Sequence, residues 1–262
     1  MRQDFKSLGD RLKAIESKNS SYLSPYLPVY ARLDGKAFSK FTKGMNKPFD
    51  DTLHRMFIDT VTTLVDETNA SIAYHQSDEI SLYWEVGATD LFNGRIDKWI
   101  GELSGLATAK FNQLTMEYFP DKLYRLPRFD CRIMSVDDDT ALKFFLWRQM
   151  DCIKNSVSVL AQQHFSHNQL LKINTKTKRE WLSEKGVPWE DLNPEYKYGS
   201  FVRKQEKLLP VELSGIDPKY HHNVPDMVTR NVITKVVYSP LQNFDDLRDL
   251  LWYDECKRYI IT

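Results

Sequence analysis

Residues 72–86 read IAYHQSDEISLYWEV. Two short runs rich in β-branched and aromatic residues flank the polar tetrad Gln76-Ser77-Asp78-Glu79. This pattern is typical of a β-hairpin whose tip carries the acidic pair.

The segments on both sides of this hairpin complete a known order of elements. Upstream, VYARLDGKAF (29–38) alternates like a strand and breaks at Asp34-Gly35, and apolar residues at helical spacing predict a helix from about residue 51 to residue 68. Downstream, the residues predict a second helix over 95–119 and a strand over 129–136. The order β-α-β-β-α-β is that of the ferredoxin-like split unit. We therefore expect an α+β fold in which both helices cover one face of an antiparallel sheet and the other face is left to hold something.

Polymerase palms and RNA-binding modules share this fold, so the fold alone does not decide the function. We expect residues 1–136, which include a helix over 5–17, to form a palm-like domain. Residues 137–262 are expected to add helices and a small mixed extension, packed on the palm as one compact unit. Their predicted elements are a helix over 139–165 capped by Asp137 to Asp139, its helical continuation to Gly186, strands near 198–204 and 230–238, and a short helix near 244–252.

The composition of the 262 residues is that of a globular protein, with 42% hydrophobic and 27% charged residues. The formal net charge is zero, so any contact with nucleic acid must come from local basic patches. Cys131, Cys152 and Cys256 show no paired spacing, which indicates reduced thiols in the cytoplasm. The first residues lack the apolar core of a signal peptide, and no apolar run approaches the roughly 20 residues that span a bilayer, so no membrane partner is expected.

Two acidic motifs are the candidate catalytic site. In a β-α-β-β unit the end of the first strand can meet the hairpin tip, so Asp34 and Asp78 could share one site. Two adjacent carboxylates repel each other unless a cation lies between them, and magnesium prefers such oxygen ligands. Gly35 allows its backbone to approach a metal or phosphate closely, and Glu79 is expected to have a supporting role. The plainer alternative is that Asp-Gly and Ser-Asp-Glu are ordinary turns.

Further polar residues lie on the predicted helix 139–165 and beyond it. Arg148, Cys152, Asn155 and Gln162 share one helix face, which favours a groove that contacts triphosphate or RNA, with Asn155 as the actual contact; the alternative is a buried structural network. Basic residues that are candidates for tRNA contact, or simply for a solvated helix face, are Lys172, Lys176, Lys178, Arg179 and Arg203. The scattered tryptophans are interpreted as core or interface residues.

The chain resembles the tRNA-His guanylyltransferase (Thg1) family over roughly residues 1–205. Several blocks in the family's order carry the resemblance: RLDGKAF (32–38), NKPFD (46–50), YHQSDEISL (74–82), FDCR (129–132), FFLWRQMDCIKNSVSVLAQQHFSHNQL (144–170) and YKYGSFV (196–202). The resemblance implies a polymerase-like palm that adds nucleotides in the 3′→5′ direction.

The resemblance also implies residue roles. Asp34, Asp78 and the carbonyl oxygen of Gly35 would hold two Mg²⁺ ions, and Glu79 would belong to the catalytic set. Expected contacts to nucleotide or phosphate are made by Arg32, Lys36, Ala37, Phe38, Lys47, Asp50, Ser77 and Arg132. The implied reaction activates a tRNA 5′-monophosphate with ATP, then lets the 3′-hydroxyl of GTP or another NTP displace AMP, and finally removes a terminal pyrophosphate. The family further implies a homotetramer.

One departure from the family pattern bears on the substrate. Where the eukaryotic guanylyltransferases have His-Ile-Asn-Asn-Leu-Tyr-Asn, residues 153–159 read IKNSVSV, so Ile153 replaces the leading histidine. This pattern is closer to the Thg1-like proteins and favours repair of truncated tRNA 5′ ends, alongside G−1 addition to tRNA-His. Two other functions stay open from the sequence: a non-catalytic RNA-binding module, and a nucleotidyl cyclase on a related palm, although the chain lacks a Gly-Gly-Asp/Glu-Glu-Phe tip.

Overall fold

The structure, a computed structural model, describes residues 2–18, 20–214, 217–238 and 259–260. Its strands form one antiparallel sheet in the order β4-β1-β3-β2-β5-β6-β7. Their bounds are β1 Val29–Lys36, β2 Ile72–Gln76, β3 Glu79–Trp84, β4 Arg128–Ser135, β5 Ser200–Pro210, β6 Met227–Tyr238 and β7 Tyr259–Ile260. The central order β4-β1-β3-β2 is that of the ferredoxin-like unit, so the predicted fold is confirmed.

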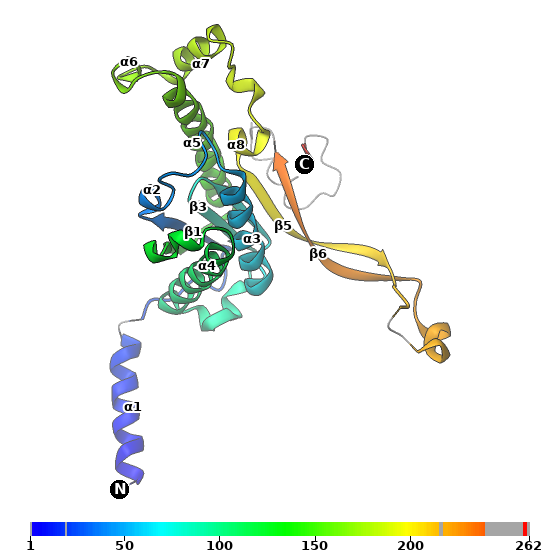
Figure 1. The fold of residues 1–262 in the computed structure, drawn as a ribbon. Helices are drawn as coiled ribbons and strands as arrows, with labels where there is room; N and C mark the ends of the chain where they lie inside the picture. Colours follow the sequence, from blue (N-terminus) through cyan, green and yellow to red (C-terminus); the bar gives the residue numbers. More distant parts are fainter. Residues whose placement is uncertain (1, 19, 215–216, 239–258, 261–262) are drawn as a thin grey trace.

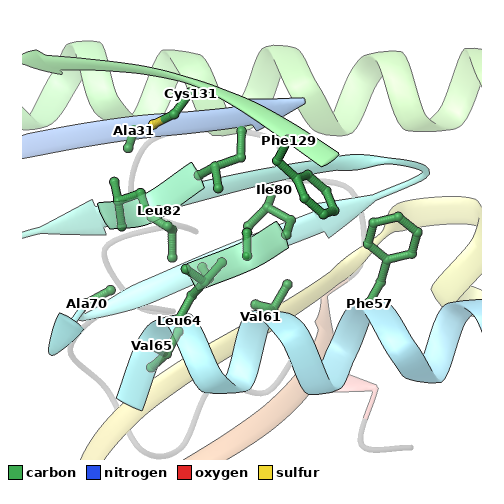
Figure 2. Close-up of a cluster of buried hydrophobic side chains, with 14 of the residues drawn as sticks. Ala31, Phe57, Val61, Leu64, Val65, Ala70, Ile80, Leu82, Phe129 and Cys131 are labelled. Atoms are coloured by element: carbon green, nitrogen blue, oxygen red, sulfur yellow. The ribbon is translucent and has the colours of Figure 1, made fainter. Parts of the chain in front are cut away.

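Two helices cover one face of the sheet, as predicted. Helix α3 (Asp51–Thr68) begins at Asp50, whose carboxylate caps it by accepting a hydrogen bond from the backbone N–H of Leu53 at 3.0 Å. Helix α4 (Ile96–Tyr118) packs beside α3. Figure 2 shows apolar side chains of α3 pointing toward those of the strands, among them Val61, Leu64, Ile80 and Leu82, all of which are fully buried. This core fixes the sheet because each large apolar side chain removed from water contributes about 1.5–3 kcal/mol.

The opposite face of the sheet is partly covered, which corrects the expectation of a free second face. Helix α5 (Asp138–His164), capped by Asp137 as predicted, packs on it with Ala141, Leu142 and Phe145. The ring of Tyr30 on β1 stacks on Phe144 of α5 at 4.6 Å. The strands supply buried aromatic side chains on this face, and the apolar side of α5 removes them from water. The end of β1 and the edge strand β4 stay accessible, with Asp34 half-buried.

The prediction that the chain continues as a helix from α5 to Gly186 is wrong. The chain instead forms a short helix α6 (His167–Leu170) and then α7 (Thr175–Glu184). Ser166 and Asn174 act as N-caps, and the Asn174 side chain accepts a hydrogen bond from the Thr177 N–H at 2.9 Å. Such side chains bind the backbone locally and start new helices, so they interrupt the helical periodicity.

The last described elements extend the sheet. After α8 (Pro194–Tyr198), strands β5 and β6 lie where two strands were predicted but are longer, and they project from the body as a twisted ribbon (Figure 1). The helix predicted near 244–252 lies outside the described residues. The remaining short elements are α2 (Phe38–Phe41) and the 3₁₀ helices η1 (Ala88–Gly94), η2 (Pro120–Arg125), η3 (Trp189–Asp191) and η4 (Pro218–Asn223).

Helix α1 (Arg2–Lys18) is the predicted N-terminal helix, and it stands away from the body in Figure 1. Its apolar side chains Leu8, Leu12 and Ile15 are exposed. Among the described helices, none combines the length and the hydropathy needed to cross a bilayer.

Candidate active site

The end of β1 and the tip of the β2–β3 hairpin meet, as the sequence predicted. The Gly35 N–H donates a hydrogen bond to the Asp78 carbonyl oxygen at 2.9 Å. Asp34 lies directly opposite Glu79 in the β1–β3 register, and Ser77 adopts a left-handed conformation (φ 54°) that turns the tip. Three acidic side chains that are up to 45 positions apart, from 34 to 79, therefore gather at one end of the sheet.

The carboxylate of Asp34 acts electrostatically on Asp78. Burial raises the pKa of Asp78, and the neighbouring Asp34 carboxylate raises it further. The Ser77 hydroxyl donates a hydrogen bond to the Asp78 carboxylate at 3.2 Å, which partly offsets this effect. Within the described residues, no group of three or more His, Cys, Asp or Glu side chains has the arrangement of a metal site. An opposite charge near these carboxylates would lower the pKa of Asp78 again, because it stabilises the ionised form.

Gly35 is the residue that lets the two loops approach so closely. A Cβ at this position would lie 2.7 Å from Phe38 Cε2 and 2.9 Å from Asp78 Cβ. Phe38 cannot easily move because it is buried among Phe41, Phe57, Phe111 and Phe129. The close spacing of the Asp34 and Asp78 carboxylates therefore depends on residue 35 having no side chain.

Gly35→Ala should lower the free energy of unfolding by about 1–3 kcal/mol, the usual cost of overpacking, and should displace Asp78. Urea unfolding of the variant measures the loss. Gly105→Ala is the matched control, because a Cβ on this α4 glycine meets nothing within 4 Å and should stabilise the helix by about 0.5–1 kcal/mol. Equal stability of Gly35→Ala and the wild type would contradict the close approach.

Glu79 is held by two arginines rather than pointing freely into the site. Arg148 on α5 donates from Nε to Glu79 Oε1 at 2.5 Å and from Nη1 to Asp151 at 2.9 Å, and Arg32 Nε lies 3.9 Å from Glu79 Oε2. Burial raises the pKa of Glu79 even though both guanidiniums lower it. Sequence reasoning placed Arg148 on the polar face of its helix but did not pair it with Glu79.

A cavity of about 380 Å³ opens beside Asp78. Of the residues predicted to bind nucleotide or phosphate, those that line it are Phe38, Lys47, Asp50, Ser77 and Asn155. Lys47 and Asn155 are exposed at its wall, whereas the Asp50 carboxylate is engaged by the backbone N–H groups of Asn46 and Leu53. Asp50 therefore shapes the loop that carries Lys47.

The cavity lining also includes an aromatic pair, next to a charged cluster, that the sequence analysis missed. The rings of Phe49 and Tyr196 stack at 4.3 Å with an interplanar angle of 4°. Next to them, His54 and Lys235 both bind the carboxylate of Glu195, with Lys235 Nζ 2.7 Å from Oε1. The hydrogen bond from His54, supported by Lys235, lowers the pKa of Glu195 to about 2 although burial opposes it. These partners come from α3, α8 and β6, so only the folded chain brings them together.

His75 lies buried at the base of the cavity and makes stability depend on pH. Its Nε2 contacts the Ser77 carbonyl oxygen at 2.9 Å, and its ring stacks on Phe57 at 4.7 Å. Burial lowers the pKa of His75 to about 3. Because the unfolded histidine binds a proton at a higher pH than the folded one, this group contributes stability above pH 6.5 that is lost as pH falls toward 3.

Between pH 7 and pH 5, the wild type should therefore lose about 2 kcal/mol more free energy of unfolding than His75→Gln, which keeps an N–H donor but does not titrate. Urea unfolding at both pH values measures the difference. The low pKa of Glu195 affects only more acidic conditions, and other groups cancel in the comparison with the wild type. His167→Gln, at an exposed histidine on α6, is the control and should keep the wild-type pH dependence. Parallel curves for the wild type and His75→Gln would refute the buried neutral histidine.

The remaining predicted residues lie outside the cavity lining. Lys36 and Arg132 are exposed on β1 and β4, and Ala37 has a left-handed backbone (φ 64°) that ends β1. In the basic run, Lys172 is exposed, Lys176 lies 3.9 Å from Glu180, Lys178 bonds Ser158, and Arg179 binds Glu190. Arg203 is only 4% exposed, so its side chain presents little surface to a tRNA.

An antiparallel palm with two carboxylates beside a cavity is typical of the class of palm-type nucleotidyltransferases. Residues 9–137 match the family described as tRNAHis guanylyltransferase, Thg1. A bacterial tRNA(His) guanylyltransferase (Thg1)-like protein in complex with ATP has a similar structure, with a TM-score of 0.70 and 33% identity over 87% of this chain and 91% of that chain. A second such bacterial structure, in complex with GTP, has a TM-score of 0.67 and 29% identity over 87% of this chain and 90% of that one. The tRNA(His) guanylyltransferase of Kluyveromyces lactis is 28% identical over 211 residues, 73% of this chain and 88% of that protein. The chain belongs to the tRNA(His) guanylyltransferase (Thg1) family.

Proposed function

We propose that the protein is a magnesium-dependent 3′→5′ nucleotidyltransferase that adds nucleotides to the 5′ end of tRNA. The observation that carries this proposal is the meeting of Asp34 and Asp78 at the edge of a cavity with Lys47 on its wall. In this proposal residues 1–136 form the catalytic palm, and residues 137–262 complete the site through α5 and α8. The bacterial relatives are described in complex with ATP and GTP, which supports these two nucleotides as substrates.

The donor atoms suit magnesium. Asp34, Asp78 and the Gly35 carbonyl offer hard oxygen ligands, and the two carboxylates raise the free energy of the site unless a cation shares it. Two Mg²⁺ ions bound there would activate the attacking oxygen and stabilise the leaving pyrophosphate. Substrate phosphate oxygens would complete the coordination, as is usual for this ion.

The other side chains position the substrates. Lys47, Ser77 and Asn155 lie where they can hold the phosphates of a nucleotide in the cavity, and Arg32 and Arg132 can bind phosphate with their guanidiniums. Glu79, fixed by Arg148, orients the neighbouring Arg32. The tRNA 5′-phosphate first takes AMP from ATP and releases pyrophosphate, the 3′-hydroxyl of the incoming NTP then displaces AMP, and a terminal pyrophosphate is removed last. No step needs a protein nucleophile, which agrees with the buried state of Cys131 and Cys152 and with their pKa values, raised to about 12.

The proposed substrates are tRNAs with incomplete 5′ ends, with addition of G−1 to tRNA-His as the related activity. Ile153, at the position where the eukaryotic enzymes have histidine, supports the broader activity. We propose contact between the tRNA body and the exposed basic residues of the α6–α7 region, a homotetrameric assembly, and action in the cytoplasm. Native mass measurement tests the assembly.

The test is nucleotide addition in the presence of ATP, GTP and magnesium to matched sets of tRNAs, full-length or lacking the first nucleotide, with and without a His anticodon. We expect templated addition to every truncated tRNA. The amount of nucleotide added should depend less on the anticodon than on the missing 5′ nucleotide. Complete absence of 5′ addition, combined with RNA binding that needs no metal, would instead identify a non-catalytic RNA-binding protein. Release of cyclic nucleotide from NTP alone would identify a cyclase.

A further inference from the structure

The edge of the sheet beside Asp34 carries three rows of like charge. In the β1–β4 register, Arg132 faces Arg32, Asp130 faces Asp34, and Arg128 faces Lys36. These side chains share one face of the sheet, because the alternate residues of β4, such as Phe129 and Cys131, are buried in the core on the other face. An acidic row therefore lies between two basic rows.

Like charges directly opposite on neighbouring strands are destabilising, so both basic rows favour a bound anion. Among the described residues, the side chains of Lys36 and Arg128 have no hydrogen-bond or ion-pair partner. The Arg132 guanidinium is half exposed, and its ion pair with Asp130 is long, at 3.7 Å. The two basic rows are about 13 Å apart along the strand, since Lys36 lies four positions after Arg32. A single phosphate group cannot reach both rows, whereas a polynucleotide backbone can.

An exposed tryptophan stands over the same edge. Trp147 on α5 is 46% exposed, although the sequence analysis placed the tryptophans in core or interface positions, and Trp84, Trp99 and Trp189 are indeed buried. The guanidiniums of Arg148 and Arg32 lie 4.3 and 5.3 Å from its ring centroid. Both arginines also bind Glu79 of the sheet, and the Phe144 ring packs against the Trp147 ring with 6.3 Å between the centroids. The ring is thus held in place with a free surface.

We propose that this edge receives the single-stranded end of the RNA substrate. One base of that end stacks on Trp147, and backbone phosphates of the same strand lie on Arg128 and Lys36. Stacking on an aromatic ring next to basic side chains is the general way in which proteins bind single strands. The nucleotide cavity lies on the other side of the carboxylates, since its lining comes from residues 38–57, 75–78, 152–159 and 195–196 and includes none of β4. Asp34 and Asp78 thus lie between an RNA side and a nucleotide side. This inference rests on the proposed function and names the path of its RNA.

The first test measures binding of a 5′-phosphorylated RNA hairpin with a short single-stranded end, together with KM for RNA and for NTP. Trp147→Ala should weaken RNA binding about 5- to 150-fold, the range for loss of one stacked base. It should raise KM for RNA and leave KM for NTP unchanged, and Trp147→Phe should restore most of the affinity. Tyr22→Ala is the matched control, because Tyr22 is an exposed aromatic residue that bridges to Arg95 at the start of α4.

The second test measures the salt dependence of RNA binding. Each phosphate contact to a single strand contributes about 0.7 to the slope of log K against log salt, so Arg128→Gln should flatten the slope by about 0.7 and Lys36→Gln with Arg128→Gln by about 1.4. Lys98→Gln, at an exposed lysine of α4 on the opposite face, should leave the slope unchanged.

Unchanged RNA affinity in Trp147→Ala, or an unchanged slope in the double variant, would overturn the inference while nucleotide addition by the wild type still supports the proposed function. Conversely, a wild type that adds no nucleotide but binds RNA through Trp147 would refute the function and support this surface. A loss in Trp147→Ala that Trp147→Phe does not restore, with an equal rise in KM for NTP, would show a structural role for Trp147 and also overturn the inference.

Discussion

Asp34→Asn and Asp78→Asn should each reduce nucleotide addition to a truncated tRNA by about a thousandfold. Each change removes one charged ligand from the pair and with it several kcal/mol of stabilisation of the transferring phosphates. Single-turnover addition at saturating RNA and NTP isolates the chemical step from binding. Both variants should keep their affinity for RNA, because neither side chain belongs to the basic rows.

The folded state should tolerate these two changes. Burial and the neighbouring carboxylate raise the pKa of Asp78, so the charged form is disfavoured in the folded protein, and a neutral amide removes that cost. We expect both variants to melt at or above the wild-type temperature. A thousandfold loss of activity in a protein of unchanged stability would separate catalysis from folding.

Asp130→Asn is a demanding control for the same experiment. Asp130 lies directly opposite Asp34 on β4, and its side chain is half exposed. The proposal assigns it no metal, so its loss should change addition by less than about tenfold, within the range of an indirect electrostatic effect. If Asp130→Asn is as inactive as Asp34→Asn, or if Asp34→Asn keeps wild-type rates, then the pairing of Asp34 with Asp78 is not the source of catalysis.

The fold could be predicted because its signals are local. Alternation over 72–86, a turn-forming Asp34-Gly35 and helical spacing over 51–68 and 95–119 each act within a few residues, and their order selects one topology. The meeting of the two acidic loops followed from that topology alone. The breaks between α5 and α6 and between α6 and α7 were missed because two side-chain caps, at Ser166 and Asn174, outweighed a helical pattern that continued across them.

The rest of the site could not be predicted because its contacts join distant segments. Phe49 meets Tyr196 across 147 positions, and nothing in either segment indicates the other. Arg203 lies in a basic cluster in the sequence but is buried in the fold, since burial depends on the packing of β5 between β2 and β6. Periodicity predicts which face of an element is apolar, but it does not predict which element will cover that face.

Arg148→Met should lower the free energy of unfolding by about 3–5 kcal/mol, the usual cost of removing one partner of a buried ion pair. Arg148 and Glu79 are both about 90% buried, with side chains 9% and 10% exposed, and their contact is 2.5 Å. Methionine fills much of the same volume, so the loss comes from the Glu79 charge that is left behind. Thermal unfolding should show a decrease of roughly 6–20 °C for a chain of this size.

The double variant Arg148→Met with Glu79→Gln separates charge from packing. The double variant no longer buries the unpaired Glu79 charge, so it should recover most of the stability that the single variant loses. Comparing the double variant with the two single variants gives the coupling energy between Arg148 and Glu79. The control is Lys154→Met, at an exposed position of α5. Gln149→Met on the same helix turn is not suitable, because the Gln149 side chain donates a hydrogen bond to the Tyr198 carbonyl oxygen.

The pH dependence of the single variant supplies an independent check. Burial already raises the pKa of Glu79, and without its main cation the pKa should rise further. A group whose pKa is higher in the folded state costs stability as pH rises through that pKa, so Arg148→Met should be closest to the wild type in acid and fall behind it toward neutral pH. A loss that is the same at pH 5 and pH 8, and that Glu79→Gln does not repair, would mean that Arg148 stabilises α5 through Trp147 and Asp151 rather than through Glu79. The arginine would then link the helix to the RNA side of the site without fixing the carboxylate beside Asp34.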